Sequence, residues 1–191
     1  MPPKIKVTKE DIIKISLEIV RKSGAEALNA RSIASELGCS TQPIFSNFSS
    51  MEELEESVAL AAREVYLSFL ESEARSGRYP EYKAYGMAYI RFAKDERELF
   101  KLLFMCDRQG KSPDKAEETS DFEASVEYIM RATGMTREKA RLMHLEVWTC
   151  VHGIAVMIAT SFLELDTELV SRMTSDIYQG LSRYHSKEET K

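Results

Sequence analysis

An uncharged stretch, residues 37–51 (LGCSTQPIFSNFSSM), carries the side chains best suited to specific hydrogen bonding. No Asp, Glu, Lys or Arg occurs in it, although these four types make up 30% of the chain. Gln42 and Asn47 each carry an amide that can pair with N6 and N7 of adenine, and Thr41 carries a methyl group that can contact thymine. This pattern favours a surface that reads base edges in a DNA groove.

A second set of reactive side chains, His144, Trp148 and His152, lies on one face of a predicted helix. The two histidines are eight residues apart, about 12 Å along a helix, which is too far for one metal ion. Cys150 and His152 point to nearly opposite sides of a helix, which argues against a nucleophile and its base. We therefore expect no catalytic residue, no metal site and no cofactor. The face is either core packing or the wall of a ligand pocket.

Composition indicates a helical protein of the cytoplasm. A chain of 191 residues, 43% of them apolar, can bury a core, and only five prolines and eight glycines interrupt helices. The net charge of −5 excludes a wholly basic coat, although residues 1–50 sum to +2 and the remainder to −7. Three widely spaced cysteines without a CxxC pair, and the absence of a signal core, favour a reducing compartment. No apolar stretch is judged long enough to span a membrane.

Two helices with recognisable ends are predicted before the uncharged stretch. Thr8 caps the first, with Asp11 at the capping-box position, and Gly24 ends it in a left-handed conformation. Asn29 caps the second, ARSIASEL, and Gly38 ends it.

The third predicted helix is short and presents the polar side chains. Ser40 caps it, and Pro43 is tolerated in its first turn. Ile44 and Phe48, four residues apart, point inward. The outward side chains are then Thr41, Gln42, Phe45, Ser46 and Asn47. Three short helices joined by tight turns form the helix-turn-helix pattern.

The rest of the chain predicts six more helices and no strand. Ser50 with Glu53, and Asp95 with Glu98, are read as capping boxes, and Thr136 is read as a cap. The helices are predicted from 50 to 75, 81 to 93, 95 to 105, 120 to 133, 137 to 162 and from 166, with a loop at 107–118 and a frayed tail from 185. The fold class is all-α with about nine helices: a helix-turn-helix DNA-binding domain at 1–50 and a larger ligand-binding and dimerisation domain at 51–191.

The segment NARSIASELGCSTQPIFSNFSSMEELEESV resembles the DNA-binding segment of the TetR family of transcriptional regulators. The matching positions are Arg31, Ile33, Ala34, Gly38, Cys39, Ser40, Ile44, Phe45, Phe48, Glu52, Glu53 and Leu54. The segment EVWTCVHGIAVM is similar to the Trp-x-x-x-His-Gly signature of one subgroup of TetR C-terminal domains, and ERELFKLLFM is similar too. The resemblance implies a homodimeric, ligand-responsive repressor that a small molecule releases from a double-stranded DNA operator. It implies no enzymatic activity.

Three residues depart from the family pattern: Phe45 stands where a Tyr is usual, Asn47 where a His or Tyr is usual, and Met51 where a Lys is usual. The family's Tyr and Lys hold phosphates, so phosphate contact here must be weaker or come from elsewhere. An N-terminal arm with Lys4, Lys6 and Lys9 is one source. The expected DNA-binding residues are Lys4, Lys6, Asn29, Arg31, Ser40, Thr41, Gln42, Pro43, Phe45, Ser46 and Asn47.

An effector pocket needs an apolar wall with a few polar groups. The candidates are Tyr66, Tyr89, Phe92, Phe104, Tyr128, Met143, Trp148 and His152. Arg91 either counters an anionic ligand or lies at the surface, and Gly153 either permits close helix approach or weakens its helix. Dimer contacts are expected from Ala155, Met157, Ile158, Phe162, Val170, Met173, Ile177 and Tyr184.

Two rival functions remain open. An all-helical enzyme or adaptor would use the C-terminal cavity, but the sequence offers no clustered acid–base pair. A nonspecific DNA-packaging protein would need a more basic chain.

Overall fold

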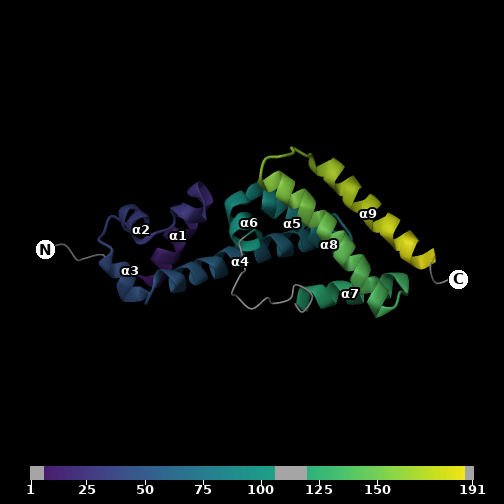
Figure 1. Cartoon of the computed structure of the whole chain (residues 1–191), viewed down its shortest axis with the longest axis horizontal. Coiled ribbons are helices and arrows are strands. Elements are labelled where there is room, and N and C mark those ends of the chain that lie inside the picture. Colours follow the sequence, from purple (N-terminus) through teal and green to yellow (C-terminus); the bar gives the residue numbers. More distant parts are fainter. Residues whose placement is uncertain (1–6, 106–119, 188–191) are drawn as a thin grey trace. The chain divides into compact units, whose positions relative to one another are not determined.

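The computed structural model describes residues 7–105 and 120–187 (Figure 1). Lys4, Lys6, Cys106 and the loop predicted at 107–118 lie outside the described residues. Within them the regular elements are all helices: α1 (Lys9–Ser23), η1 (Ala25–Ala27), α2 (Ala30–Glu36), α3 (Gln42–Asn47), α4 (Met51–Ser76), α5 (Glu81–Asp95), α6 (Arg97–Phe104), α7 (Ser120–Thr133), α8 (Arg137–Ala159) and α9 (Thr167–Lys187).

The described residues form two compact units. Unit 1 comprises residues 7–68 and 95–105, and unit 2 comprises 69–94 and 120–187. The chain was expected to divide at residues 50 and 51, where α4 begins, and the boundary between the compact units falls within α4, after residue 68. The chain passes from one unit to the other within α4, at the end of α5 and between α6 and α7.

Helix α1 begins and ends as its local sequence predicts. Thr8 and Asp11 form the complete capping box, with Asp11 N donating to Thr8 Oγ1 over 3.1 Å. Gly24 ends the helix, but its φ of 83° and ψ of 168° are not the left-handed helical conformation that was expected. A Cβ atom at Gly24 would lie 2.7 Å from the Glu26 carboxylate and 3.3 Å from that of Glu98, so a side chain there would require these flexible carboxylates to move.

Helix α6 belongs to unit 1, which the sequence alone did not reveal. It packs against α1, and its Leu99 and Phe100 are fully buried. Arg21 of α1 donates to Glu96, immediately before α6, over 2.9 Å. The predicted capping box of Asp95 and Glu98 is wrong: Glu96 occupies the cap position without a side-chain bond, and Glu98 pairs with Lys101.

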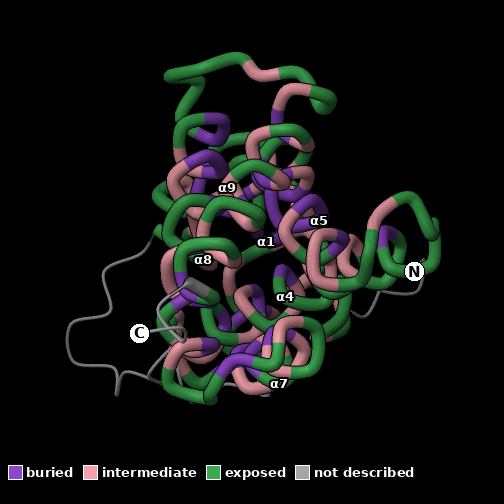
Figure 2. The backbone as a smooth tube through the Cα atoms, turned by 90° about the vertical axis from the view of Figure 1, so that its right-hand side faces the viewer, coloured by how far each residue is buried: buried purple, intermediate pink, exposed green. Residues whose placement is uncertain are grey.

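Unit 2 is built around α8, which lies beside α7 and α9 (Figure 1). Buried and exposed residues alternate along α8 and α9, as in helices that pack one face (Figure 2). Helix α8 ends at Ala159, three residues before the predicted end, and Asp166 caps α9 by accepting from Leu169 N over 2.7 Å.

The chain end is more ordered than its composition suggests. His185, predicted to lie in a frayed tail, is 2% exposed and bonds Glu146 of α8 over 2.7 Å. Helix α9 therefore continues to Lys187 because its last turns pack on α8.

Helix α8 is long and apolar enough to cross a membrane by length and composition, with a mean hydropathy of 1.5 and 39% of its most apolar window buried. A core helix passes the same test. Because α8 packs between α7 and α9 and its two histidines are bonded to side chains of α5, we interpret it as the core helix of unit 2.

Candidate nucleic-acid interface

Helix α3 presents a polar face because its two large apolar anchors are buried. Ile44 is 0% and Phe48 2% exposed, and both pack into unit 1. The opposite side displays Gln42 and Ser46, and Phe45 with 53% of its surface exposed. An exposed phenylalanine beside uncharged hydrogen-bonding groups suits the sugar and base edges of a groove.

Hydrogen bonds within α3 show which of its polar side chains are already bonded inside the helix. Asn47 Nδ2 donates to the Pro43 carbonyl over 2.8 Å, and Ser46 Oγ donates to the Gln42 carbonyl over 2.9 Å. The Gln42 side chain is exposed and makes no bond to another described residue. Gln42 is therefore the side chain of α3 that is most available to a base.

Residues before α3 take different roles from those expected. The cap position is Thr41 rather than Ser40, and Thr41 makes no side-chain capping bond. Ser40 is exposed, and Pro43 lies in the first turn as predicted. Asn29 caps α2 by accepting from Arg31 N and Ser32 N, so its amide is occupied inside the protein.

Arg31 is the cation on the expected DNA-binding face that the structure describes. Its side chain is exposed and forms no ion pair with a described residue. Such an arginine can approach a phosphate without first breaking an internal bond.

A network around Glu53 holds the turn between α3 and α4. The Glu53 carboxylate accepts from Ser49 N and Ser49 Oγ, both over 2.8 Å, and from Lys9 Nζ over 3.0 Å. The Ser49 N–H and then Lys9 lower the pKa of Glu53 to about 2. Lys9 also lies 4.6 Å above the centre of the Phe48 ring. Lys9, expected in a phosphate-binding arm, instead forms an ion pair with Glu53 of α4. The backbone N–H that donates to the Glu53 carboxylate is that of Ser49, where the predicted capping box had Ser50.

The eight residues proposed for an effector pocket fall in both units. Tyr66 and Phe104 belong to unit 1, where their rings meet edge to face at 5.3 Å. The other six belong to unit 2: Tyr89, Phe92, Tyr128, Met143, Trp148 and His152. Phe92 and Met143 are fully buried, so they are core residues of unit 2.

Trp148, His152 and Tyr89 form one contact group. The His152 ring stacks on Trp148 with 5.5 Å between centres, and Tyr89 Oη lies 2.8 Å from His152 Nδ1. Burial lowers the pKa of His152. Trp148 keeps 40% of its surface exposed, so this group is the accessible part of the predicted pocket wall.

His144 sits in an aromatic cluster that the sequence analysis did not assemble. Its Nδ1 lies 2.8 Å from Tyr82 Oη, and its ring meets Phe122 at 4.5 Å. Tyr82 in turn stacks on Tyr128 at 5.6 Å and contacts Tyr178 at 5.5 Å. Burial lowers the pKa of His144 to about 4 and raises that of Tyr82. Both α8 histidines are bonded to tyrosines of α5, as the core-packing interpretation requires.

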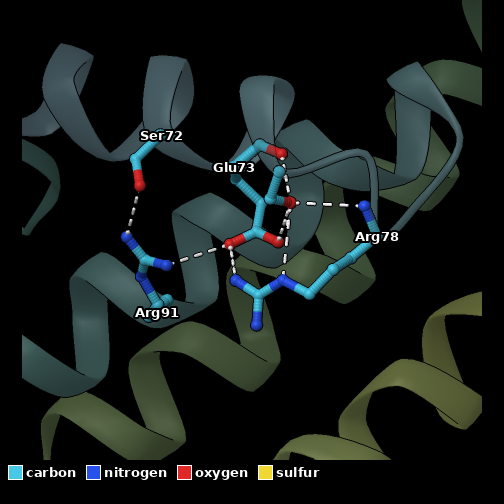
Figure 3. A network of polar contacts seen from close by, with 5 residues as sticks. Ser72, Glu73, Arg78 and Arg91 are labelled. Carbon is cyan, nitrogen blue, oxygen red and sulfur yellow. Dashed lines mark hydrogen bonds and ion pairs between the residues drawn. The ribbon is translucent and has the colours of Figure 1, made fainter.

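A buried carboxylate, Glu73 near the end of α4, was also missed. It is 2% exposed and accepts from Arg78 over 2.9 Å and Arg91 over 3.0 Å (Figure 3). Arg91 continues to Ser72, and Ser76 donates to the Glu73 carbonyl. Arg91, read as a surface residue or an anion contact, is thus part of an ion-pair network.

The expected dimer residues divide by exposure. Ala155, Ile158 and Val170 are buried within unit 2, whereas Met157, Phe162 and Tyr184 are 38%, 77% and 59% exposed. A Cβ atom on Gly153 would meet nothing within 4 Å, so the described part of this chain makes no close approach there. Among the described residues, no group of three or more His, Cys, Asp or Glu side chains is placed to hold a metal ion.

Comparison with known proteins agrees with this arrangement. Residues 82–177 match the family model described as tetracyclin repressor-like, C-terminal domain. A helix-turn-helix-type transcriptional regulator of Mycobacterium tuberculosis is 22% identical over 182 residues, covering 93% of this chain and 83% of the relative.

Two solved structures from Rhodococcus sp. RHA1 are similar along nearly the whole chain. A protein of unknown function has a TM-score of 0.72 at 20% identity, covering 95% of this chain and 100% of that one. A TetR-like transcriptional regulator has a TM-score of 0.68 at 12% identity, covering 94% and 96%.

Proposed function

The chain belongs to the tetracyclin repressor-like C-terminal domain family, and from this premise we propose that it is a DNA-binding transcriptional regulator controlled by a small molecule. We further propose that it is a cytoplasmic repressor that a bound effector releases from its operator. The observation that carries the proposal is the face of α3, where Gln42 and Phe45 are exposed while Ile44 and Phe48 anchor the helix.

In this proposal unit 1 is the DNA-binding head. Gln42 reads a base edge, Phe45 packs on the sugar–phosphate edge and Arg31 contacts phosphate. Ser40, Thr41, Pro43, Ser46 and Asn47 complete the surface, and Asn29 supports it as the cap of α2. Because few cations lie on this face, the affinity for DNA should depend only weakly on salt. The slope of log affinity against log salt concentration should be about one unit for each phosphate contact.

The exposed apolar side chains of unit 2 support the proposal of a homodimer. Met157 lies on α8, Phe162 directly after it and Tyr184 on α9. Burying these three side chains against a second copy of the chain removes apolar surface from water. Two heads are also needed to reach successive major grooves, about 34 Å apart.

Coupling between effector and DNA is proposed to run along α4 and along the α5–α6 junction, which are two of the places where the chain passes between units. Helix α4 begins after the turn that follows α3 and ends at Ser76, close to Glu73. Helix α6 follows α5 directly in the chain and packs on α1. An effector that favours one arrangement of unit 2 would bias both connections. DNA and effector must then weaken each other's binding by the same factor.

A gel shift with the DNA upstream of the protein's own gene, with and without competitor, tests the function. We expect specific retardation, loss of preference in Gln42→Ala and no change in the control Ser68→Ala. Ser68 is exposed on α4, 17 residues beyond Met51, or about 25 Å along the helix. Retardation by any sequence would favour a packaging protein. No retardation would favour an enzyme or adaptor.

A further inference from the structure

Unit 2 contains a hollow that none of the predicted pocket residues lines. It has a volume of about 110 Å³ and lies between the end of α4, α5, the end of α8 and the start of α9. Its lining combines apolar side chains with the ends of three cationic residues, Arg78, Arg91 and Lys94.

Burial separates the lining into a floor and a rim. Met87, Ile90, Ile158 and Val170 are each no more than 5% exposed, so they form an apolar floor. Arg78 and Lys94, by contrast, are exposed and belong to the rim. A molecule seated here would meet hydrocarbon first and positive charge at its outer end.

The lining holds three cationic residues and one acidic residue. Glu73 is the one acidic residue of the lining, and a single oxygen, Oε2, accepts from both Arg78 Nη2 and Arg91 Nη1. Figure 3 shows the carboxylate of Glu73 between the two guanidinium groups, which it holds in fixed orientations. Within the described residues, Lys94 forms no ion pair and Arg78 Nη1 makes no hydrogen bond, so both can still accept an anion.

We propose that this hollow binds a small organic carboxylate, with its apolar body on the floor and its carboxylate at Arg78 and Lys94. A cavity of about 150 Å³ can hold benzene, so a hollow of about 110 Å³ fits a body of about four or five carbon atoms, with the carboxylate at the rim. A neutral molecule would leave Lys94 without an ion-pair partner, and an inorganic anion would leave the floor uncovered. Because the proposed function makes unit 2 the effector-binding part, such a carboxylate is the class of effector that this site would take.

Calorimetric titration of the full chain with hexanoate tests the proposal, with hexan-1-ol and inorganic phosphate as comparison ligands. We expect one saturable hexanoate site per chain and about tenfold weaker binding of the other two. Equal binding of hexan-1-ol, equal binding of phosphate, or no saturation by hexanoate up to about 10 mM would overturn the proposal.

Three variants separate the site from nonspecific charge. Lys94→Met should weaken hexanoate about threefold to fivefold, as expected for an exposed ion pair, while Arg131→Met, an exposed cation of α7 outside the hollow, should change nothing. Glu73→Gln should tighten hexanoate about threefold because the guanidinium groups lose their competing anion. A purely structural role for the network predicts no tightening. Equal effects of the two methionine variants, or weaker binding in Glu73→Gln with an unchanged circular dichroism spectrum, would refute the assignment.

The titration contains no DNA, so its result does not depend on the proposed function. If hexanoate binds but leaves the gel shift unchanged, the site stands and its role as an effector site is wrong. If the protein does not bind DNA at all, the proposed function fails while the titration still decides the site.

Discussion

The stability of unit 2 should fall as the pH is lowered through the range in which histidine titrates, and His144 should be a main cause. His144 is 9% exposed, and its Nδ1 lies 2.8 Å from the Tyr82 hydroxyl, from which a neutral imidazole can accept a hydrogen bond. Burial lowers its pKa from 6.5 to about 4. Between these values the unfolded chain binds a proton that the folded chain does not, so stability is complete above pH 6.5 and declines toward pH 4.

The size of the effect follows from the two pKa values. A difference of about 2.5 pKa units corresponds to a total loss of about 3 kcal/mol, of which about 2 kcal/mol is lost between pH 8 and pH 5. The burial of His152 lowers its pKa in the same direction, and its effect adds to that of His144.

Urea unfolding followed by Trp148 fluorescence measures this quantity locally, because Trp148 is the only tryptophan and lies one helical turn from His144. The variant His144→Gln can still accept the Tyr82 hydrogen bond but does not titrate. We expect the stability difference between pH 8 and pH 5 to be about 2 kcal/mol smaller in the variant than in the natural chain. The same difference in both proteins, or a natural chain that is more stable at pH 5, would refute the reasoning.

Three further substitutions have expected outcomes. Ser16→Ala should raise the melting temperature, because Ser16 Oγ is buried without a hydrogen-bond partner among the described residues. Its removal relieves a desolvation cost of about 1 kcal/mol. A lower melting temperature would show that the hydroxyl is bonded. Phe48→Ala should destabilise unit 1 by about 3–5 kcal/mol in thermal unfolding and abolish DNA binding, and retained operator binding would show that α3 does not need its anchor. Gly153→Leu should leave the fold intact by circular dichroism, since its Cβ meets nothing within 4 Å, yet should shift sedimentation toward monomer if α8 forms the dimer contact; an unchanged dimer would place the contact elsewhere.

The sequence predicted the elements whose causes are local. The capping box of Thr8, the cap at Asn29 and the inward pair Ile44 and Phe48 are all confirmed, because each depends on residues within one or two helical turns. The fold class is confirmed for the same reason: helical periodicity and caps recur along the chain.

What the sequence did not reveal depends on contacts between residues far apart. Arg21 and Glu96 are 75 residues apart, and Glu96, which accepts from Arg21, occupies the cap position of α6 in place of Asp95. Lys9 meets Glu53 across 44 residues, which removes it from the expected phosphate-binding arm. Neither pairing leaves a periodic signal, since a charged residue on a solvated face and one in an ion pair look alike in sequence.

The candidate pocket shows the same limit. Aromatic side chains with polar tips were predicted to line one pocket, but their distribution over two units could not be read from spacing. The hollow at Glu73 was missed because its cations come from the α4–α5 connection and α5, and its floor from α5, α8 and α9.

DNase footprinting of the purified protein on the DNA upstream of its own gene tests the central claim most directly. The account predicts two protected segments with centres about 34 Å apart along the duplex, both lost in Gln42→Ala at a protein concentration that protects fully with the natural chain. Uniform protection of the whole fragment, or an unchanged footprint with Gln42→Ala, would contradict a pair of α3 helices reading bases through that side chain.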